Sequence, residues 1–174
     1  MTNTTLRGMT AALVLMAGLG TAAAQESTNV VATEGDWTVF AAENPKECWA
    51  VSPPRATQNT DANGAPREVT RGDIRLYVAY RPGQGGEVSF SGGYPFAPDS
   101  TVEVDVGGTT FNLFTEGESA WTGSASEDEK LIGALRGGTN AVITGRSSRG
   151  TVTKDTFSLA GITAATNTAR ARCE

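Results

Sequence analysis

The stretch TVEVDVGGTTFNLF, residues 101–114, decides the fold, because it predicts a β-hairpin whose register can be checked against its own polarity. Gly107-Gly108 supplies a two-residue turn that accepts positive φ. Folding the chain at this turn places apolar pairs on one face and polar pairs on the other. The apolar pairs are Val104 with Phe111 and Val102 with Leu113, and the polar pairs are Glu103 with Asn112 and Asp105 with Thr110. We therefore expect a hairpin with one apolar face.

The chain before this hairpin also predicts strands. Short runs rich in aromatic and β-branched residues lie at 37–41 and 48–52, with a polar turn between them around Asn44-Pro45. Residues 53–73 are polar and unpatterned, so we expect a long loop there, with a small protruding hairpin at Asn63-Gly64.

A central strand is predicted at 74–80, where alternation places four large residues on one face. These residues are Ile74, Leu76, Val78 and Tyr80. Shorter strands are expected at 88–90, near 141–147 and near 151–159, and the last two join through Ser148-Arg149-Gly150.

Two helices interrupt the strand pattern. Ser126 with Glu129 predicts a capping box, and Gly137-Gly138 ends the helix that follows. Its buried stripe is expected to be Leu131, Ile132 and Leu135. A last helix is predicted from about Ile162 to Arg172, with one face made by Ile162, Ala165, Ala169 and Cys173. About seven to nine short strands are typical of an antiparallel β-sandwich, so we predict an all-β sandwich with one inserted short helix and a C-terminal helix.

The first 24 residues predict a cleaved export signal. Arg7 precedes an apolar run at 11–17, and Ala22-Ala23-Ala24 lies before Gln25, which is the order of an n-region, an h-region and a cleavage site. The apolar run is too short to span a bilayer, and we expect no transmembrane segment after cleavage. The domain is then predicted to be residues 25–174, in the periplasm, with secretion or surface association as alternatives.

Two cysteines in an exported chain predict one disulfide, between Cys48 and Cys173. The alternative is a redox-active pair. A redox pair favours C-x-x-C spacing and a lowered thiol pKa, and the two cysteines lack that spacing.

The composition excludes several classes of function. The chain has no His, so it lacks a Ser-His-Asp triad and a His-ligated metal site, and we expect no cofactor and no metal. It carries 19 acidic against 14 basic residues, with a net charge of −5, and Arg7 belongs to the predicted signal. An acidic domain lacks the positive footprint of nucleic-acid binding.

Candidate chemistry remains in three places. Glu116 and Glu118 flank Gly117 and suit a carboxylate pair of a glycosidase-like cleft, or a solvated turn. Arg71-Gly72-Asp73 spells a cell-adhesion tripeptide, although it adjoins the central strand. Residues 61–64 resemble the start of a calcium loop, but the later ligand positions are missing, which favours a turn.

Two groups of residues are candidates for binding. Arg146, Arg149 and Lys154 lie in or beside one predicted hairpin and suit an anionic group such as a phosphate or an acidic sugar; the alternative is a solvated face. An aromatic stretch predicts either an exposed patch for a partner or a small core under a loop. Its residues are Tyr94, Phe96, Phe114 and Trp121.

The order and spacing of several motifs carry a family resemblance over the whole of residues 25–174. The motifs are Asp36-Trp37, Glu47-Cys48-Trp49-Ala50-Val51-Ser52, Arg71-Gly72-Asp73-Ile74, Gly92-Gly93-Tyr94-Pro95-Phe96-Ala97-Pro98, Phe114-Thr115-Glu116-Gly117-Glu118, Ala141-Val142, Arg146-Ser147-Ser148-Arg149-Gly150-Thr151, Asp155-Thr156-Phe157-Ser158-Leu159 and a closing helix that ends in Cys173. Together they resemble the invasion-associated locus B (IalB) family of alphaproteobacterial exported proteins. The resemblance implies an immunoglobulin-like β-sandwich and an association with host-cell invasion or stress survival in some pathogenic members. It implies no catalytic motif.

The predicted function is accordingly that of an exported, periplasmic, non-enzymatic protein that acts by binding or by supporting the envelope. Its partner is expected to be a protein or an envelope component, with no nucleic acid. The alternatives are a hydrolase of envelope glycans that uses Glu116 and Glu118, and a surface adhesin that uses residues 71–73.

Overall fold

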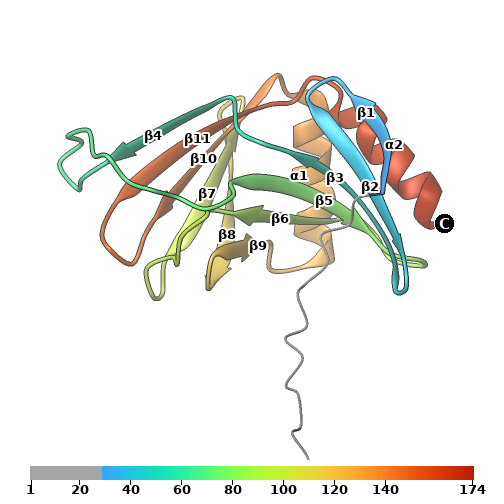
Figure 1. Cartoon of the computed structure of the whole chain (residues 1–174), viewed down its shortest axis with the longest axis horizontal. Coiled ribbons are helices and arrows are strands. Elements are labelled where there is room, and N and C mark those ends of the chain that lie inside the picture. Colours follow the sequence, from blue (N-terminus) through green and yellow to red (C-terminus); the bar gives the residue numbers. More distant parts are fainter. Residues whose placement is uncertain (1–28) are drawn as a thin grey trace, which may run out of the picture.

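Eleven strands form one continuous antiparallel sheet in the computed structural model, which describes residues 29–174 (Figure 1). The predicted export signal, residues 1–24, lies outside the described residues. The strand order is β1-β2-β3-β5-β6-β9-β8-β7-β10-β11-β4. The strands are β1 (Val30–Glu34), β2 (Trp37–Glu43), β3 (Lys46–Ser52), β4 (Ala56–Thr60), β5 (Arg75–Tyr80), β6 (Glu87–Ser91), β7 (Thr101–Val106), β8 (Thr109–Glu116), β9 (Ser119–Trp121), β10 (Asn140–Arg146) and β11 (Val152–Ser158).

The sheet folds over a single core. Buried side chains from both halves of the strand order, such as Val39, Leu76, Val104 and Ile143, belong to one hydrophobic cluster. The predicted all-β sandwich with a short helix and a C-terminal helix is confirmed. One difference from an immunoglobulin domain is that the halves are not two separate sheets, since β6 and β9 join them by hydrogen bonds.

The hairpin of residues 101–114 has the predicted register. Val104 pairs with Phe111 and Val102 with Leu113, as expected from the polarity of the two strands. Gly107 and Gly108 both have positive φ, 61° and 87°, which is what a two-residue turn between twisted strands requires. In β5, the predicted alternation is also confirmed, because Leu76, Val78 and Tyr80 are buried.

The helices close the inner side of the sheet. Helix α1 (Ala125–Gly137) lies along β6, and α2 (Ile162–Cys173) packs on β1, β2 and β3. The predicted buried stripes of both helices are confirmed. The predicted capping box is wrong by two residues, because the N-cap is Ser124, whose Oγ accepts a hydrogen bond from the Glu127 backbone N–H (3.3 Å). Among the described residues, no helix combines the length and apolar character needed to cross a bilayer.

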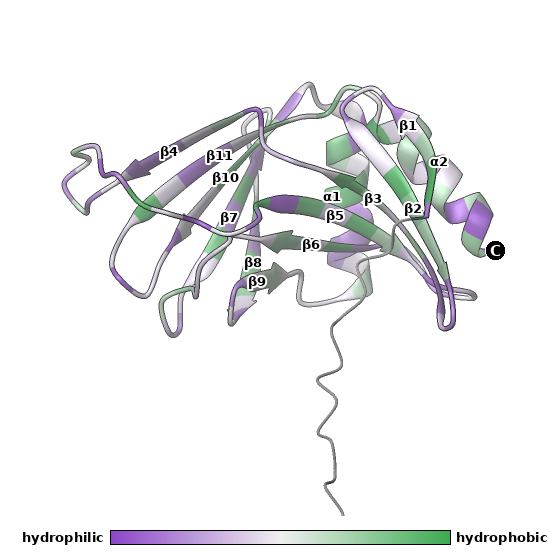
Figure 2. Cartoon of the chain, viewed as in Figure 1, coloured by the Kyte–Doolittle hydropathy of each residue, from purple (hydrophilic) through white to green (hydrophobic). Residues whose placement is uncertain are grey.

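The long loop predicted at 53–73 contains a strand that the sequence did not reveal. β4 pairs with β11 at the edge of the sheet, where its residues are largely exposed. An edge strand with little burial carries no apolar alternation, which is why its pattern resembled a loop. Figure 2 shows this hydrophilic strand beside β11 at the edge of the sheet, whereas β3 and β5, nearer its middle, contain hydrophobic residues. The small hairpin expected at Asn63-Gly64 is present, with Thr60 bridging to Pro66.

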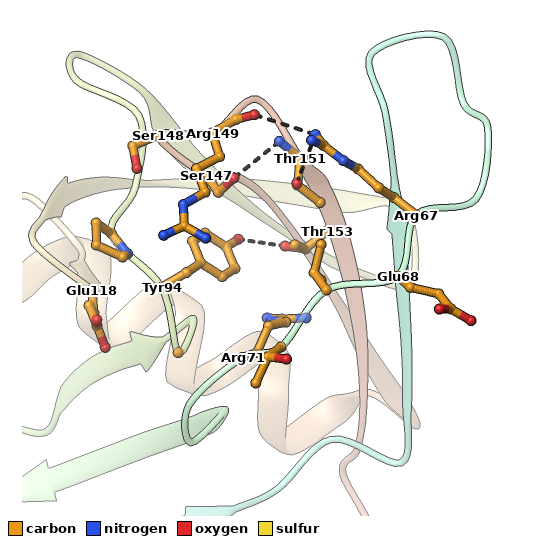
Figure 3. A pocket seen from close by; sticks show the side chains of 14 residues that line it. Arg67, Glu68, Arg71, Tyr94, Glu118, Ser147, Ser148, Arg149, Thr151 and Thr153 are labelled. Atoms are coloured by element: carbon orange, nitrogen blue, oxygen red, sulfur yellow. Dashed lines mark hydrogen bonds between the residues drawn. The ribbon is translucent and has the colours of Figure 1, made fainter.

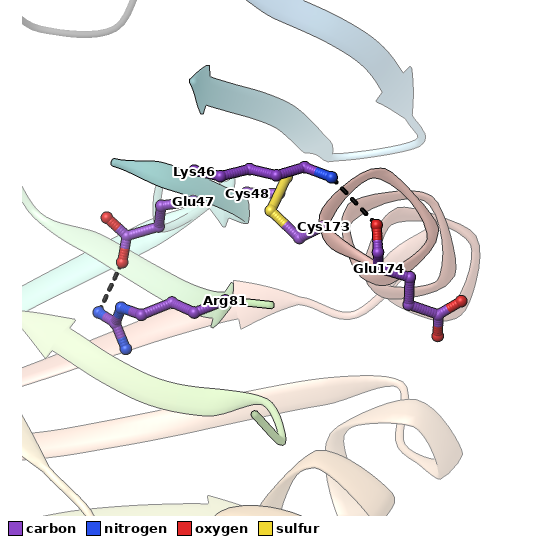
Figure 4. Close-up of a disulfide and its surroundings, with 6 residues drawn as sticks. All are labelled: Lys46, Glu47, Cys48, Arg81, Cys173 and Glu174. Atoms are coloured by element: carbon purple, nitrogen blue, oxygen red, sulfur yellow. Dashed lines mark hydrogen bonds and ion pairs between the residues drawn. A yellow bond between two sulfur atoms is a disulfide. The ribbon is translucent and has the colours of Figure 1, made fainter. Parts of the chain in front are cut away.

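The predicted disulfide between Cys48 and Cys173 is confirmed. It joins β3 to the end of α2, with a Cα–Cα distance of 5.8 Å, and both residues are buried (Figure 4). Beside it, the Lys46 Nζ donates a hydrogen bond to the backbone oxygen of Glu174 (3.0 Å). The disulfide therefore holds the last turn of α2 against the sheet.

The opposite end of the sheet is covered by residues 66–73, which we call the strap. The strap returns from the far end of β4 toward β5 (Figure 1). Its Gly72 N–H donates to the Gly93 backbone oxygen (2.8 Å), and a β-carbon on Gly93 would lie 2.6 Å from the Gly72 oxygen. Arg71 then enters the core and forms a two-bond ion pair with Asp155 of β11, at 2.6 and 2.7 Å. The Arg71 side chain is 6% exposed and that of Asp155 is 0% exposed.

Replacing both cysteines with serine is expected to lower the free energy of unfolding by about 4–5 kcal/mol, because the disulfide closes a loop spanning 125 residues of the unfolded chain. Urea denaturation of the oxidised protein and the double variant measures this difference. The reduced wild-type protein serves as the control and should match the variant. A loss below about 1 kcal/mol would contradict the expectation.

Arg71→Met is expected to lower the free energy of unfolding by about 3–5 kcal/mol, because it leaves the Asp155 carboxylate buried without its partner. Adding Asp155→Leu should restore most of the loss, since no buried charge then remains. The matched control is Arg75→Met, which breaks the exposed pair with Asp73 and should cost less than about 1 kcal/mol. Equal losses for the two arginine variants in urea denaturation would refute this account.

Candidate functional site

A cleft of about 540 Å³ opens at the end of the sandwich that the strap covers. Four segments line it: the strap, residues 93–95 after β6, the turn between β8 and β9, and residues 147–153, which form the turn after β10 and the start of β11 (Figure 3). These segments are far apart in the sequence, so the cleft exists only in the folded sheet.

The ion pair between Arg71 and Asp155 lies at the base of the cleft. Every N–H donor of the Arg71 guanidinium is used, because it also bonds to the Gly92 oxygen and to the Asn59 side chain. The guanidinium carbon lies 5.0 Å from the centre of the Tyr94 ring. This part of the cleft is therefore rigid, and its charges are internally balanced.

Polar groups beside this pair are also fixed. The hydroxyl groups of Tyr94 and Thr153 share a hydrogen bond of 2.5 Å. Burial raises the pKa of Tyr94, so its hydroxyl stays protonated at neutral pH. Burial also raises the pKa of the Asp155 carboxyl, and the hydrogen bonds from Arg71 act in the opposite direction. These groups provide a fixed surface and no solvent-exposed charge.

The turn between β10 and β11 forms one wall of the cleft. Gly150, with φ of 78°, donates its N–H to the Ser147 oxygen (2.9 Å), and the Thr151 N–H donates to the Ser147 side chain (3.1 Å). This is a three-residue hairpin loop closed by a glycine with positive φ. It places Arg149 at the tip, and Figure 3 shows the Arg149 side chain turned into the cleft.

Arg67 of the strap reaches the same turn from the other side. Its Nη1 donates to the Arg149 backbone oxygen (3.4 Å) and to the Thr151 hydroxyl (3.3 Å). Arg67 was not a candidate in the sequence, because its place depends on β4 and on the hairpin at residues 61–65. That hairpin is closed by the Asp61 carboxylate, which accepts from the N–H groups of Asn63 and Ala65. These hydrogen bonds lower the pKa of Asp61 and support the turn over the calcium loop.

The three predicted anion contacts do not lie together. Arg149 lines the cleft, whereas Arg146 and Lys154 are exposed and do not. The cause is strand alternation: Gly145 and Thr153 face the core, so their neighbours Arg146 and Lys154 point to the outer face of the sheet.

The four predicted aromatic residues separate into two pairs. Tyr94 and Phe96 are buried, 9% and 7% exposed, with ring centres 5.0 Å apart, as in the alternative of a small core under a loop. Phe114 is 49% exposed and packs beside Trp121 of the neighbouring strand, with ring centres 5.8 Å apart. The second pair lies on the outer face, because the β8 residue before Phe114, Leu113, points into the core.

The predicted acidic pair is also divided. Glu118 lines the cleft and Glu116 does not, and both are exposed. Glycoside hydrolysis needs two carboxylates, one on either side of the bond that is cleaved, and the cleft holds only one member of the predicted pair.

Among residues 29–174, no group of three or more Cys, Asp or Glu side chains is arranged to hold a metal ion.

The tripeptide at residues 71–73, weighed above as an alternative adhesion motif, does not display its arginine to solvent. Asp73 is exposed, but the Arg71 side chain is buried against Asp155. A partner that needs both side chains in solution cannot reach the arginine without breaking this ion pair.

Comparison with known proteins supports the predicted family. The family model described as "Invasion associated locus B (IalB) protein" matches residues 37–170. The crystal structure of invasion associated protein B from Bartonella henselae has a similar fold, with a TM-score of 0.53 and 16% sequence identity, covering 79% of this chain and 93% of that chain. A search of the curated proteins finds no match. Because the family model spans the sheet from β2 into α2, the chain belongs to the invasion associated locus B family.

Proposed function

We propose that this protein is exported to the periplasm, where it acts by binding an envelope component or a partner protein in the cleft beside the strap, without catalysing a reaction. The observation that carries the proposal is the preformed cleft itself, whose base is fixed by the saturated hydrogen bonds of Arg71. A site whose polar groups are already held in place loses little conformational entropy on binding. The name of the Bartonella henselae protein associates that protein with invasion, and the proposal for this chain does not include that association.

The arrangement of the side chains favours binding over catalysis. General acid–base chemistry needs a proton-transfer group within hydrogen-bond reach of a reacting atom, and a partner group that completes the reaction. Asp155, below the cleft, is committed to Arg71. The two carboxylates that line the cleft, Glu68 and Glu118, are exposed and lie on opposite sides of it (Figure 3). The cleft instead offers hydroxyl and guanidinium groups, which are hydrogen-bonding groups suited to a polar ligand.

Export is supported by the buried disulfide, since disulfides persist in oxidising compartments. We expect the protein recovered from the periplasm to begin at Gln25 and to contain no free thiol. Intact-mass analysis with a thiol-alkylating reagent measures both properties. A variant that lacks residues 1–24 is the control and should stay in the cytoplasm. Recovery of the wild-type chain from the cytoplasm with Met1 retained would contradict the proposal.

Binding in the cleft is expected to weaken by about tenfold or more in Ser148→Trp, because the indole would occupy the rim beside Arg149. The measurement is an amide NMR titration of residues 25–174 with soluble fragments of the bacterial envelope. Thr110→Trp, on an exposed position of the distant β7–β8 hairpin, is the matched control.

Two results would refute this function. One is equal binding by the Ser148→Trp and Thr110→Trp variants. The other is conversion of the fragments to new products at a rate that Glu118→Gln abolishes, which would favour the hydrolase.

A further inference from the structure

The arginines of this acidic chain differ in how their charge is balanced. Arg55, Arg71, Arg75, Arg81 and Arg170 each form an ion pair with a carboxylate. The other five arginines of residues 29–174 form no ion pair within this part of the chain: Arg67, Arg136, Arg146, Arg149 and Arg172. Of these five, only Arg67 and Arg149 line the cleft.

The hydrogen bonds of the two arginines leave most of their donors available. Arg67 uses only Nη1, in contacts of 3.3 and 3.4 Å with uncharged oxygens. The side chain of Arg149 makes no hydrogen bond within residues 29–174, while its backbone oxygen is held by Arg67. The turn thus fixes the position of Arg149 and leaves its guanidinium free to bind a ligand.

The surroundings favour a small anionic group over an extended polyanion. Figure 3 shows the side chains of Glu68 and Glu118 directed away from the middle of the cleft, on opposite sides of it. Their negative charges would repel a polyanion that crosses the rim. Ser148 and Thr151 line the cleft as well, and the Thr151 hydroxyl accepts a hydrogen bond from the Arg67 Nη1 (3.3 Å). Guanidinium groups bind carboxylates and phosphates through paired N–H donors.

We propose that the cleft binds the oxyanion, a carboxylate or a phosphate, of a small polar ligand, with Arg149 as its principal contact and Arg67 as the second. This proposal rests on the proposed function and names the chemical class of its ligand. It also reassigns the anion contacts, since Arg146 and Lys154 lie on the other face of the sheet.

The test is a set of amide NMR titrations of residues 25–174 at constant ionic strength, with three probes: inorganic phosphate, galacturonate and galactose. We expect saturable shifts of the amides of residues 147–151 with at least one of the two anions, and none with galactose. Phosphate and galacturonate distinguish the two sources of the oxyanion. Arg149→Gln should weaken the binding at least about tenfold, the loss expected for one charge-assisted hydrogen bond.

The matched control is Arg146→Gln, which removes the same charge from the same hairpin on the outer face. Its affinity should stay within about twofold of the wild-type value. Equal weakening by the two variants would overturn the proposal. It would indicate that the anion responds to the overall charge of the protein and not to a specific contact with Arg149. Equal binding of galactose and galacturonate, or no saturable shift with either anion up to about 20 mM, would also overturn it. None of these three results affects the titration with envelope fragments, which tests binding in the cleft separately.

Discussion

The buried ion pair between Arg71 and Asp155 is the interaction on which this end of the molecule depends. Asp155 occupies a core position of β11, between Thr153 and Phe157, where a carboxylate is costly to desolvate. It is tolerated there because the guanidinium of Arg71 donates two hydrogen bonds to it. The same guanidinium is bound to Gly92 and Asn59, so one side chain connects the strap, β11, β4 and the loop after β6.

The two ends of the curved sheet are closed by different means. At one end, α2 buries an apolar stripe against β1, β2 and β3, and the disulfide holds its last turn in place. At the other end, the strap has few apolar residues to bury, and Val69 is 39% exposed. Hydrogen bonds and one buried ion pair must therefore fix the strap. A closure made of polar groups leaves an open, polar cleft above it, and this is the surface to which we assign binding.

The sequence predicted the parts of the fold that depend on local pattern. The register of the 101–114 hairpin, the alternation in β5, the buried stripes of both helices and the disulfide all follow from spacing or counting. β4 was missed because an exposed edge strand has no apolar alternation. The role of Arg71 was missed because its partner is 84 residues away, and no local signal distinguishes this buried arginine from an exposed one.

The candidate site was predictable only in part. Alternation along 141–147 places Arg146 on the outer face of that strand, whereas Arg149 lies beyond the strand in the turn, so this pattern distinguishes the two arginines. Arg67 carries no such signal, because its position depends on a strand that the pattern did not reveal. Likewise, the burial of Tyr94 and Phe96 follows from the packing of a loop onto β10 and β11, which is a property of the tertiary structure.

The most direct test of the central claim is hydrogen exchange at the strap in Arg71→Lys, which keeps the charge but loses the paired hydrogen bonds. If the ion pair holds the strap in place, the Gly72 amide, which donates to the Gly93 oxygen, is protected in the wild-type protein. In the variant, this protection should fall, while the amides of β3 and β5 keep theirs. Unchanged protection of Gly72, or an equal loss in β3 and β5, would contradict the claim that Arg71 and Asp155 organise the cleft.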